Sequence, residues 1–115
     1  MDVKAALEAQ LKTLSDDAQI NLTYEDMQLA VYNVCKEAYK TENLVVQDFG
    51  SYQEKDGYDH IRFLVRVKDS EGKWHTIEDV VLVGTWNGFI KQGVVYEVEL
   101  GHTMYGASGK DPEHN

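Results

Sequence analysis

Two kinds of hydrophobic spacing divide the chain. From residue 3 to residue 14, and again from residue 27 to residue 39, apolar residues recur at every third or fourth position, which is the spacing of amphipathic helices. From residue 44 to residue 100, apolar and polar residues alternate, which is the spacing of half-buried strands, and glycine-containing turn sequences interrupt the alternation. The pattern therefore predicts two N-terminal helices followed by an antiparallel β-sheet.

The first helix is predicted over Val3–Leu14, with Asp2 as its N-cap and a loop from Ser15 to Gln19. The second helix has the clearer start, because Thr23 and Asp26 stand at the two positions of a capping box, with Asp in place of the usual Glu or Gln. Its apolar face continues for more than three turns, and we expect the helix to end near residues 41–43.

Four strands follow in the alternating region, at Leu44–Tyr52, His60–Asp69, Trp74–Trp86 and Phe89–Leu100. Each junction contains a turn sequence, namely Asp56-Gly57, Ser70-Glu71-Gly72 and Asn87-Gly88. A type I′ turn at Asn87-Gly88 would set Trp86 opposite Phe89 and Asp79 opposite Tyr96.

These elements predict one α+β domain over residues 1–101, a two-layer sandwich with both helices on one face of a four-stranded antiparallel meander. The turns assign to the covered face Ile61, Phe63, Val65, Val67, Ile77, Val81, Val83, Val94, Tyr96, Val98 and Leu100. In the first strand, either Val45, Gln47 and Phe49 or Val46, Asp48 and Gly50 could face the helices. Residues 102–115, rich in glycine and polar residues, are predicted to form a flexible tail.

Charge limits the partners that the chain can bind. Its 115 residues carry a formal net charge of −9, which counts against binding to nucleic acid or to anionic membranes and favours a protein partner with a basic surface. No apolar run is long enough for a membrane helix, and the N-terminus does not resemble a signal peptide. A single cysteine excludes an internal disulfide. We therefore expect a cytoplasmic protein.

One residue is out of place on the predicted covered face. Asp79 stands in register with Ile77 and Val81, where its carboxylate would lose its water and could serve as a general acid or base. Tyr96 on the neighbouring strand could donate a hydrogen bond to it, and His75 is four residues earlier on the same strand. The alternative is a β-bulge at Glu78-Asp79, which would turn Asp79 to solvent.

Other candidate chemistry is weak. The histidines have no metal-ligand spacing, so neither a metal nor a cofactor is predicted. The polar turn that contains Glu54, Asp56, Asp59 and His60 lacks the order of a calcium loop and is expected to be solvated. Cys35 lies on the apolar face of the second helix, where a buried thiol is inert.

The helix-free face of the sheet carries more apolar and aromatic residues than a solvated face needs. The predicted pairing places there Leu64, Trp74, Val80, Leu82, Trp86, Phe89 and Val95, together with Arg62, Arg66, Lys68, Thr76, Glu78, Glu97 and Glu99. Tryptophan and arginine are enriched in binding hot spots. The predicted interface residues are accordingly Arg62, Leu64, Arg66, Trp74, Trp86 and Phe89. The alternative is a set of Arg–Glu ladders whose side-chain stems cover the aliphatic residues.

Three functions are compatible with these patterns. The first is a small acidic binding protein that acts by protein–protein contact, in the class of inhibitors, immunity proteins or anti-defence proteins of phages and mobile elements, an assignment by analogy of size and charge. The second is a small-molecule site or small enzyme between helices and sheet, which would use Asp79, Tyr96 and His75. The third is a homodimeric structural domain. The charge and the helix-free face favour the first, a non-enzymatic binding protein.

Overall fold

The computed structural model describes residues 2–18 and 22–101 of the protein, with the backbone alone for residues 14–18. Its helices are α1 (Val3–Ala18) and α2 (Tyr24–Tyr39), and its strands are β1 (Leu22–Thr23), β2 (Leu44–Gln53), β3 (Asp59–Lys68), β4 (Trp74–Asn87) and β5 (Gln92–Leu100). The predicted α+β class is confirmed, and the predicted tail lies outside the described residues. In the described part of the chain, no helix is both long enough and apolar enough to cross a membrane.

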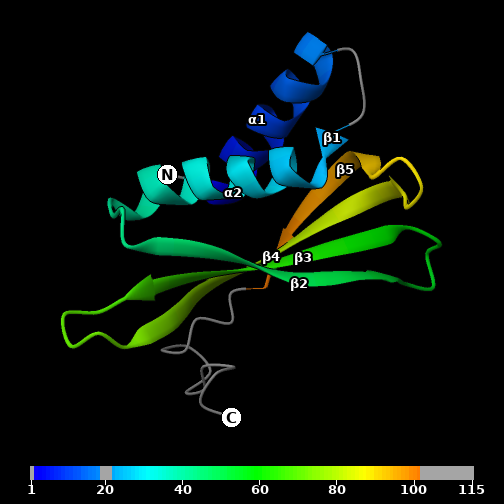
Figure 1. The fold of residues 1–115 in the computed structure, drawn as a ribbon. Coiled ribbons are helices and arrows are strands. Elements are labelled where there is room, and N and C mark those ends of the chain that lie inside the picture. Colours follow the sequence, from blue (N-terminus) through cyan, green and yellow to red (C-terminus); the bar gives the residue numbers. More distant parts are fainter. Residues whose placement is uncertain (1, 19–21, 102–115) are drawn as a thin grey trace.

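The sheet has five antiparallel strands in the order β1-β5-β4-β3-β2, one more than predicted (Figure 1). The additional strand is β1, in which Leu22 pairs with Gly93 and Thr23 pairs with Gln92. Sequence alternation does not reveal a strand of two residues. It forms because the extended residue that caps α2 lies beside the start of β5.

Local signals explain most of the helix boundaries. The predicted capping box is present, since Thr23 Oγ1 accepts a hydrogen bond from the backbone of Asp26 and the Asp26 carboxylate accepts one from the backbone of Thr23. Helix α2 ends at Tyr39, and Lys40 follows with a left-handed φ of 53°. The predicted end near residues 41–43 is therefore a few residues late. Helix α1 continues to Ala18, four residues beyond the predicted end.

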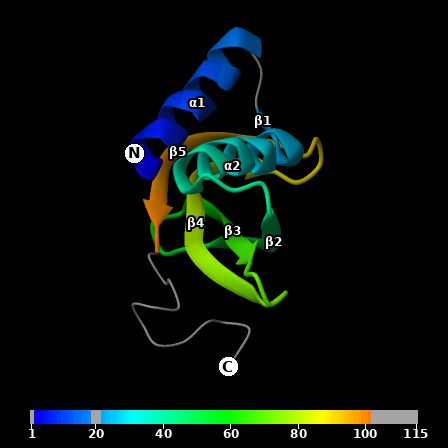
Figure 2. The same cartoon turned by 90° about the vertical axis from the view of Figure 1, so that its left-hand side faces the viewer.

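Both helices lie on one face of the sheet, and the core forms between these layers (Figures 1 and 2). Phe63 lies at its centre with its ring 5.3 Å from the ring of Tyr24 on α2. Leu44 and Val46 of β2 are buried in this core, whereas Val45 and Phe49 are exposed. The register that was ambiguous in the sequence is thus the one in which Val46 faces the helices.

A β-bulge at Ile77 reverses the faces of β4 along most of its length. Near the β3–β4 turn, Lys68 pairs with Trp74 and Arg66 with Thr76, as the predicted loop requires. Beyond Ile77 the register shifts by one residue, so that Val65 pairs with Glu78. Val80, Leu82 and Glu78 consequently face the helices, and Val81 and Val83 face away, so the predicted faces of these five residues are wrong. Asp79 also faces away from the helices, as the alternative of a bulge in this strand predicted.

The β4–β5 turn also differs from its prediction. The loop covers residues 88–91, and Trp86 pairs with Gly93 instead of facing Phe89. The Asn87 side chain accepts hydrogen bonds from the backbone of Phe89 and Ile90, and Lys91 takes the left-handed conformation with a φ of 58°. The type I′ turn fails because Asn87 closes a wider loop with its own side chain.

Two further register shifts bend the sheet. In β5 the shift leaves Tyr96 unpaired between Val95, which pairs with Gly84, and Glu97, which pairs with Val83. In β2 the shift falls between Asp48 and Ser51, at Phe49-Gly50. Bulges increase the twist of a strand, and Figure 2 shows β4 bending along its length beneath the helices. Because of the bulge in β5, two further predicted placements are wrong. Val95, predicted on the helix-free face, packs against the core, and Tyr96, predicted on the covered face, is exposed.

Candidate functional site

The buried acid of the helix-covered face is Glu78, not Asp79. The bulge at Ile77 turns Glu78 inward, where it is only 2% exposed and accepts a hydrogen bond of 3.2 Å from the Tyr39 hydroxyl. Burial, together with the charge of Glu78, raises the pKa of the Cys35 thiol to about 12 and also raises the pKa of Tyr39. The thiol is fully buried, so this cluster has no access for a substrate.

Asp79 lies on the opposite, helix-free face, which we call the open face. A bulge does turn it away from the helices, at Ile77 directly before the predicted Glu78-Asp79, yet Asp79 is only 5% exposed and not turned to solvent. Its carboxylate binds Arg62 through two hydrogen bonds, from Nε at 2.9 Å and from Nη2 at 2.5 Å. The hydrogen bond with Asp79 raises the pKa of Arg62. This bidentate pair is the arrangement of a structural ion pair rather than of a general acid.

The other two members of the predicted catalytic group lie elsewhere. His75 pairs with Val67, and its Nε2 is 2.7 Å from the Asp69 carboxylate at the β3–β4 turn. Tyr96 is 61% exposed and packs edge-on against Tyr58, with ring centres 5.8 Å apart. The structure therefore does not bring Asp79, Tyr96 and His75 together.

The predicted interface residues divide into three groups. Arg62, Leu64, Arg66 and Trp74 share the open face, whereas Trp86 packs under α2 and Phe89 is wholly exposed in the β4–β5 loop. Leu64 is buried. The guanidinium of Arg66 lies over the Trp74 ring and donates a hydrogen bond to Gln47. Most of these side chains are thus held in contacts within the chain.

A different part of the open face combines aromatic rings with acidic side chains. One cross-strand row runs through Tyr52, His60, Val83 and Glu97, each on a different strand. Glu99 stands two residues beyond Glu97, in the adjacent row. Because side chains in register share a face of a sheet, four strands contribute to one continuous surface.

Tyrosines complete this region, which we call the tyrosine–acid surface and define by Tyr52, Asp56, Tyr58, Tyr96, Glu97 and Glu99. The three tyrosines are between 42% and 61% exposed. Asp56 lines two adjacent hollows, one with Tyr52 and Glu99 and the other with Tyr58, Tyr96 and Glu97. The sequence did not reveal this cluster, because the unpredicted bulge at Tyr96 is what sets Tyr96 beside Glu97 on the open face.

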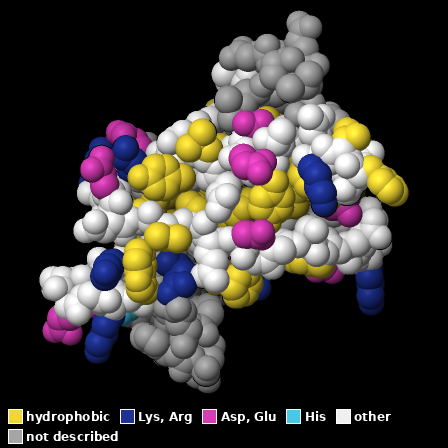
Figure 3. All heavy atoms as spheres, in the orientation of Figure 1, with side chains coloured by type: hydrophobic (Ala, Val, Ile, Leu, Met, Phe, Trp, Pro, Cys, Tyr) yellow, Lys and Arg dark blue, Asp and Glu magenta, His cyan; other side chains and the backbone are white. Residues whose placement is uncertain are grey.

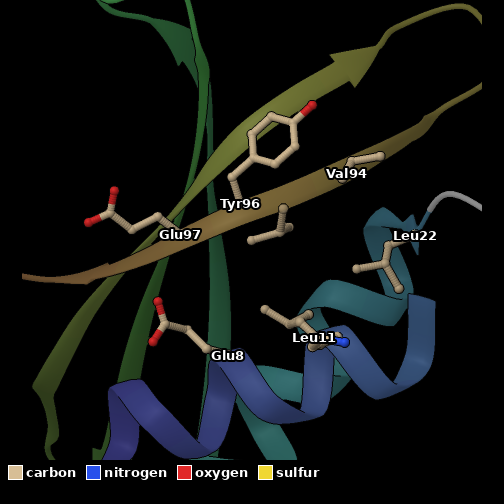
Figure 4. A pocket seen from close by; sticks show the side chains of 8 residues that line it. Glu8, Leu11, Leu22, Val94, Tyr96 and Glu97 are labelled. Atoms are coloured by element: carbon tan, nitrogen blue, oxygen red, sulfur yellow. The ribbon is translucent and has the colours of Figure 1, made fainter. Parts of the chain in front are cut away.

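A groove between α1 and the edge of β5 is the nearest equivalent of the predicted site between helices and sheet (Figure 4). It has a volume of about 410 Å³, and Glu8 and Leu11 of α1 face β5, which carries Val94, Tyr96 and Glu97. Glu8 also accepts a hydrogen bond from the backbone of Val98 and so covers part of the sheet edge. The groove contains neither Asp79 nor His75.

The opposite edge of the sheet, at β2, carries exposed apolar side chains. Leu29 on α2 and Val45 and Phe49 on β2 are each about half exposed, and a shallow hollow lined by Leu29, Tyr32 and Val46 separates the helix from the strand. In Figure 3, hydrophobic side chains gather across the middle of this side, with acidic side chains among them. We call Leu29, Val45, Val46 and Phe49 the β2-edge surface.

Among the described residues, no group of three or more His, Cys, Asp or Glu side chains is arranged to hold a metal ion. No protein-family model, no curated protein and no solved structure matches the chain. Its function must therefore be inferred from its own surfaces.

Proposed function

We propose that this protein is a small acidic binding protein that holds a basic protein partner on the tyrosine–acid surface. The observation that carries the proposal is the convergence of three exposed tyrosines and three carboxylates, from β2, the β2–β3 turn and β5, on one end of the open face. Tyrosine is among the residues enriched in binding hot spots, because it buries a large ring and keeps a polar hydroxyl.

Charge gives the surface its specificity. The protein carries a net charge of −9, and Asp56, Glu97 and Glu99 are all exposed on this surface. The nearest basic groups to these carboxylates lie at 3.8–4.0 Å, namely Lys4 for Glu97 and, for the other two, His60, which is charged only when it is protonated. Such long contacts neutralise a carboxylate weakly, so a basic partner would meet a negative surface and associate faster at low salt.

The class of activity is the one expected from the sequence, protein–protein contact. The binding surface is a different one, because it includes none of Trp74, Trp86 and Arg66. An inhibitor, an immunity protein or an anti-defence protein would work in this way, by covering a basic surface of its target. Catalysis has less support, because the Asp79 carboxylate accepts two hydrogen bonds from Arg62 and the Cys35 thiol is buried.

Affinity capture with three baits tests the proposal. Wild-type protein, the Tyr58→Ala/Tyr96→Ala variant and a Phe89→Ala/Ile90→Ala control are used to capture proteins from cells that produce the protein. The control removes two exposed apolar side chains from the β4–β5 loop, neither of which belongs to the tyrosine–acid surface. We expect a basic protein on the wild-type and control baits, reduced at least about tenfold on the tyrosine variant. Equal recovery on all three baits would refute the proposal.

A second candidate is self-association through the β2-edge surface, because β2 is a terminal strand and Leu29, Val45 and Phe49 are exposed beside it. Pairing of β2 with its copy would extend the sheet across a two-fold axis. Sedimentation of wild-type protein and of Val45→Lys over a range of concentrations tests this candidate. A wild-type dimer that Val45→Lys dissociates would support it, and a wild-type monomer at every concentration would refute it.

A further inference from the structure

We propose that the hollow between the β2–β3 turn and β5 is a guanidinium site, which takes an arginine side chain of the basic partner. The hollow has a volume of about 380 Å³ and is lined by Tyr52, Glu54, Lys55, Asp56, His60 and Glu99. This inference rests on the proposed function, since the partner that it describes is the one that the tyrosine–acid surface would hold.

His60 is the residue that distinguishes this hollow from an ordinary acidic turn. Its sequence neighbours are polar and suggested a solvated turn, yet the residue is only 5% exposed. Its ring stacks on Tyr52, with centres 5.2 Å apart and planes 19° apart. Burial and stacking hold the imidazole in one orientation, with one edge toward the hollow.

The two ring nitrogens of His60 have different roles. Nδ1 lies 3.1 Å from the backbone carbonyl of Tyr58, and because a carbonyl can only accept, Nδ1 carries the proton in the neutral ring. Nε2 then presents a lone pair. Its carboxylate neighbours, Oδ2 of Asp56 at 3.8 Å and Oε1 of Glu99 at 4.0 Å, are beyond hydrogen-bonding distance. Among the described residues, no hydrogen bond to Nε2 is formed.

When the His60 ring is neutral, three acceptors from three parts of the chain thus converge, and Lys55 is the cation that lines the same hollow. Asp56 belongs to the turn, His60 to β3 and Glu99 to β5. A guanidinium is planar and carries five N–H donors, so it can bond to a carboxylate and to a neutral imidazole at once, and it stacks on aromatic rings such as Tyr52. An ammonium is compact, does not stack in this way and would bond to fewer of these acceptors.

Surrounding charges set the strength of the site. Burial, followed by the negative charge of Glu54, raises the pKa of Tyr52. Lys55 also lines the hollow and partly offsets the carboxylates, whose side chains are about half exposed. A single arginine is therefore expected to bind with a Kd on the order of millimolar, and a partner would gain the rest of its affinity from the tyrosines.

Nuclear magnetic resonance with N-acetyl-arginine amide as the ligand tests the site on the full chain. The readouts are the shifts of the His60 ring nitrogens and of the Tyr52 ring, with N-acetyl-lysine amide as the competing ligand. Glu99→Gln and Asp56→Asn remove one charge each from exposed positions, and Glu42→Gln is the matched control on the α2–β2 connection. We expect the His60 shifts to saturate as the arginine ligand is added. Either site variant should weaken the affinity for this ligand at least about fivefold, and the control should leave the affinity unchanged.

Shifts that spread over all carboxylates without saturation, equal binding of the lysine ligand, or equal binding by the site variants would each overturn the guanidinium site. The two proposals fail separately. A partner that requires Tyr58 and Tyr96, combined with no arginine binding at His60, would overturn the pocket alone. Arginine binding at His60, combined with equal capture on all three baits, would overturn the proposed function alone.

Discussion

Arg62 on β3 donates a hydrogen bond to each carboxylate oxygen of Asp79 on β4, on the open face of the sheet. The two residues are diagonal neighbours, since Arg62 pairs with Val81 and Asp79 pairs with Leu64. Phe49 covers the other side of the guanidinium, 5.1 Å away. The bulge at Ile77 creates this contact, because without it Asp79 would point toward the helices and Glu78 would take its place.

Removing one partner of this ion pair should be costly. Arg62→Met leaves the Asp79 carboxylate buried without its cation, and we expect a loss of roughly 2–4 kcal/mol in the free energy of unfolding. The double variant Arg62→Met/Asp79→Leu should recover most of that loss, because it removes both charges. Urea denaturation of the three proteins measures this, and a single variant as stable as the wild type would show that the pair contributes little.

Gly84 should tolerate no side chain. A Cβ atom there would lie 1.8 Å from the backbone oxygen of Val94, at the register shift that sets Tyr96 on the open face. Because backbone blocks the position, Gly84→Ala should cost about 3 kcal/mol or more. Gly88→Ala is the control, since open space surrounds that position and its φ is not left-handed; its effect should stay within about 0.5 kcal/mol. Equal unfolding midpoints for the two variants would contradict the bulge.

Cys35 should resist modification in the folded protein. Its burial, with the nearby charge of Glu78, raises the pKa of the thiol to about 12, so the reactive thiolate is scarce at pH 8. The reaction with a thiol reagent such as DTNB should be more than about a hundredfold slower in buffer than in denaturant. Rapid reaction in buffer would show that α2 opens readily or that the thiol is accessible.

Asp69 should make the fold sensitive to acid. Its hydrogen bond with His75, followed by one with the backbone of Lys73, lowers the pKa of the carboxyl from 3.8 to about 2. Since the pKa is lower in the folded state than in the unfolded state, this carboxylate stabilises the fold above pH 4 and the effect is lost as pH falls from about 4 to 2. Denaturation midpoints of Asp69→Asn should therefore decline less over this range than those of the wild type. Parallel declines for the two proteins would contradict the assignment.

The parts of the fold that depend on local signals could be predicted from the sequence. The capping pair Thr23 and Asp26 fixed the start of α2, and Gly72 takes the left-handed conformation expected for the β3–β4 loop. The strand pairs nearest that loop are also the predicted ones. Alternation alone could not find the bulge at Ile77, since an extra residue leaves the hydrophobic pattern of VVLV readable on either face.

The tyrosine–acid surface could not be predicted for a related reason. Its members come from β2, the β2–β3 turn and β5, and they meet only when the registers of β2, β3, β4 and β5 are all known. His60 stood in a polar stretch, and nothing in the sequence indicated that Tyr52 would stack on it. Trp74 and Trp86 were predicted to bind a partner because of their residue type. In the structure, Trp74 makes cation–π contacts with Arg66 and Lys68, and Trp86 packs against Tyr24 under α2.

The location of the bound partner is the most direct test of this account. Hydrogen–deuterium exchange of the protein, alone and with the captured basic partner, measures which backbone amides become protected. We predict protection in residues 52–60 and 95–99, with little change in residues 29–32 and 44–49. Protection confined to those latter segments, at the β2-edge surface, would contradict the assignment of the tyrosine–acid surface as the binding site.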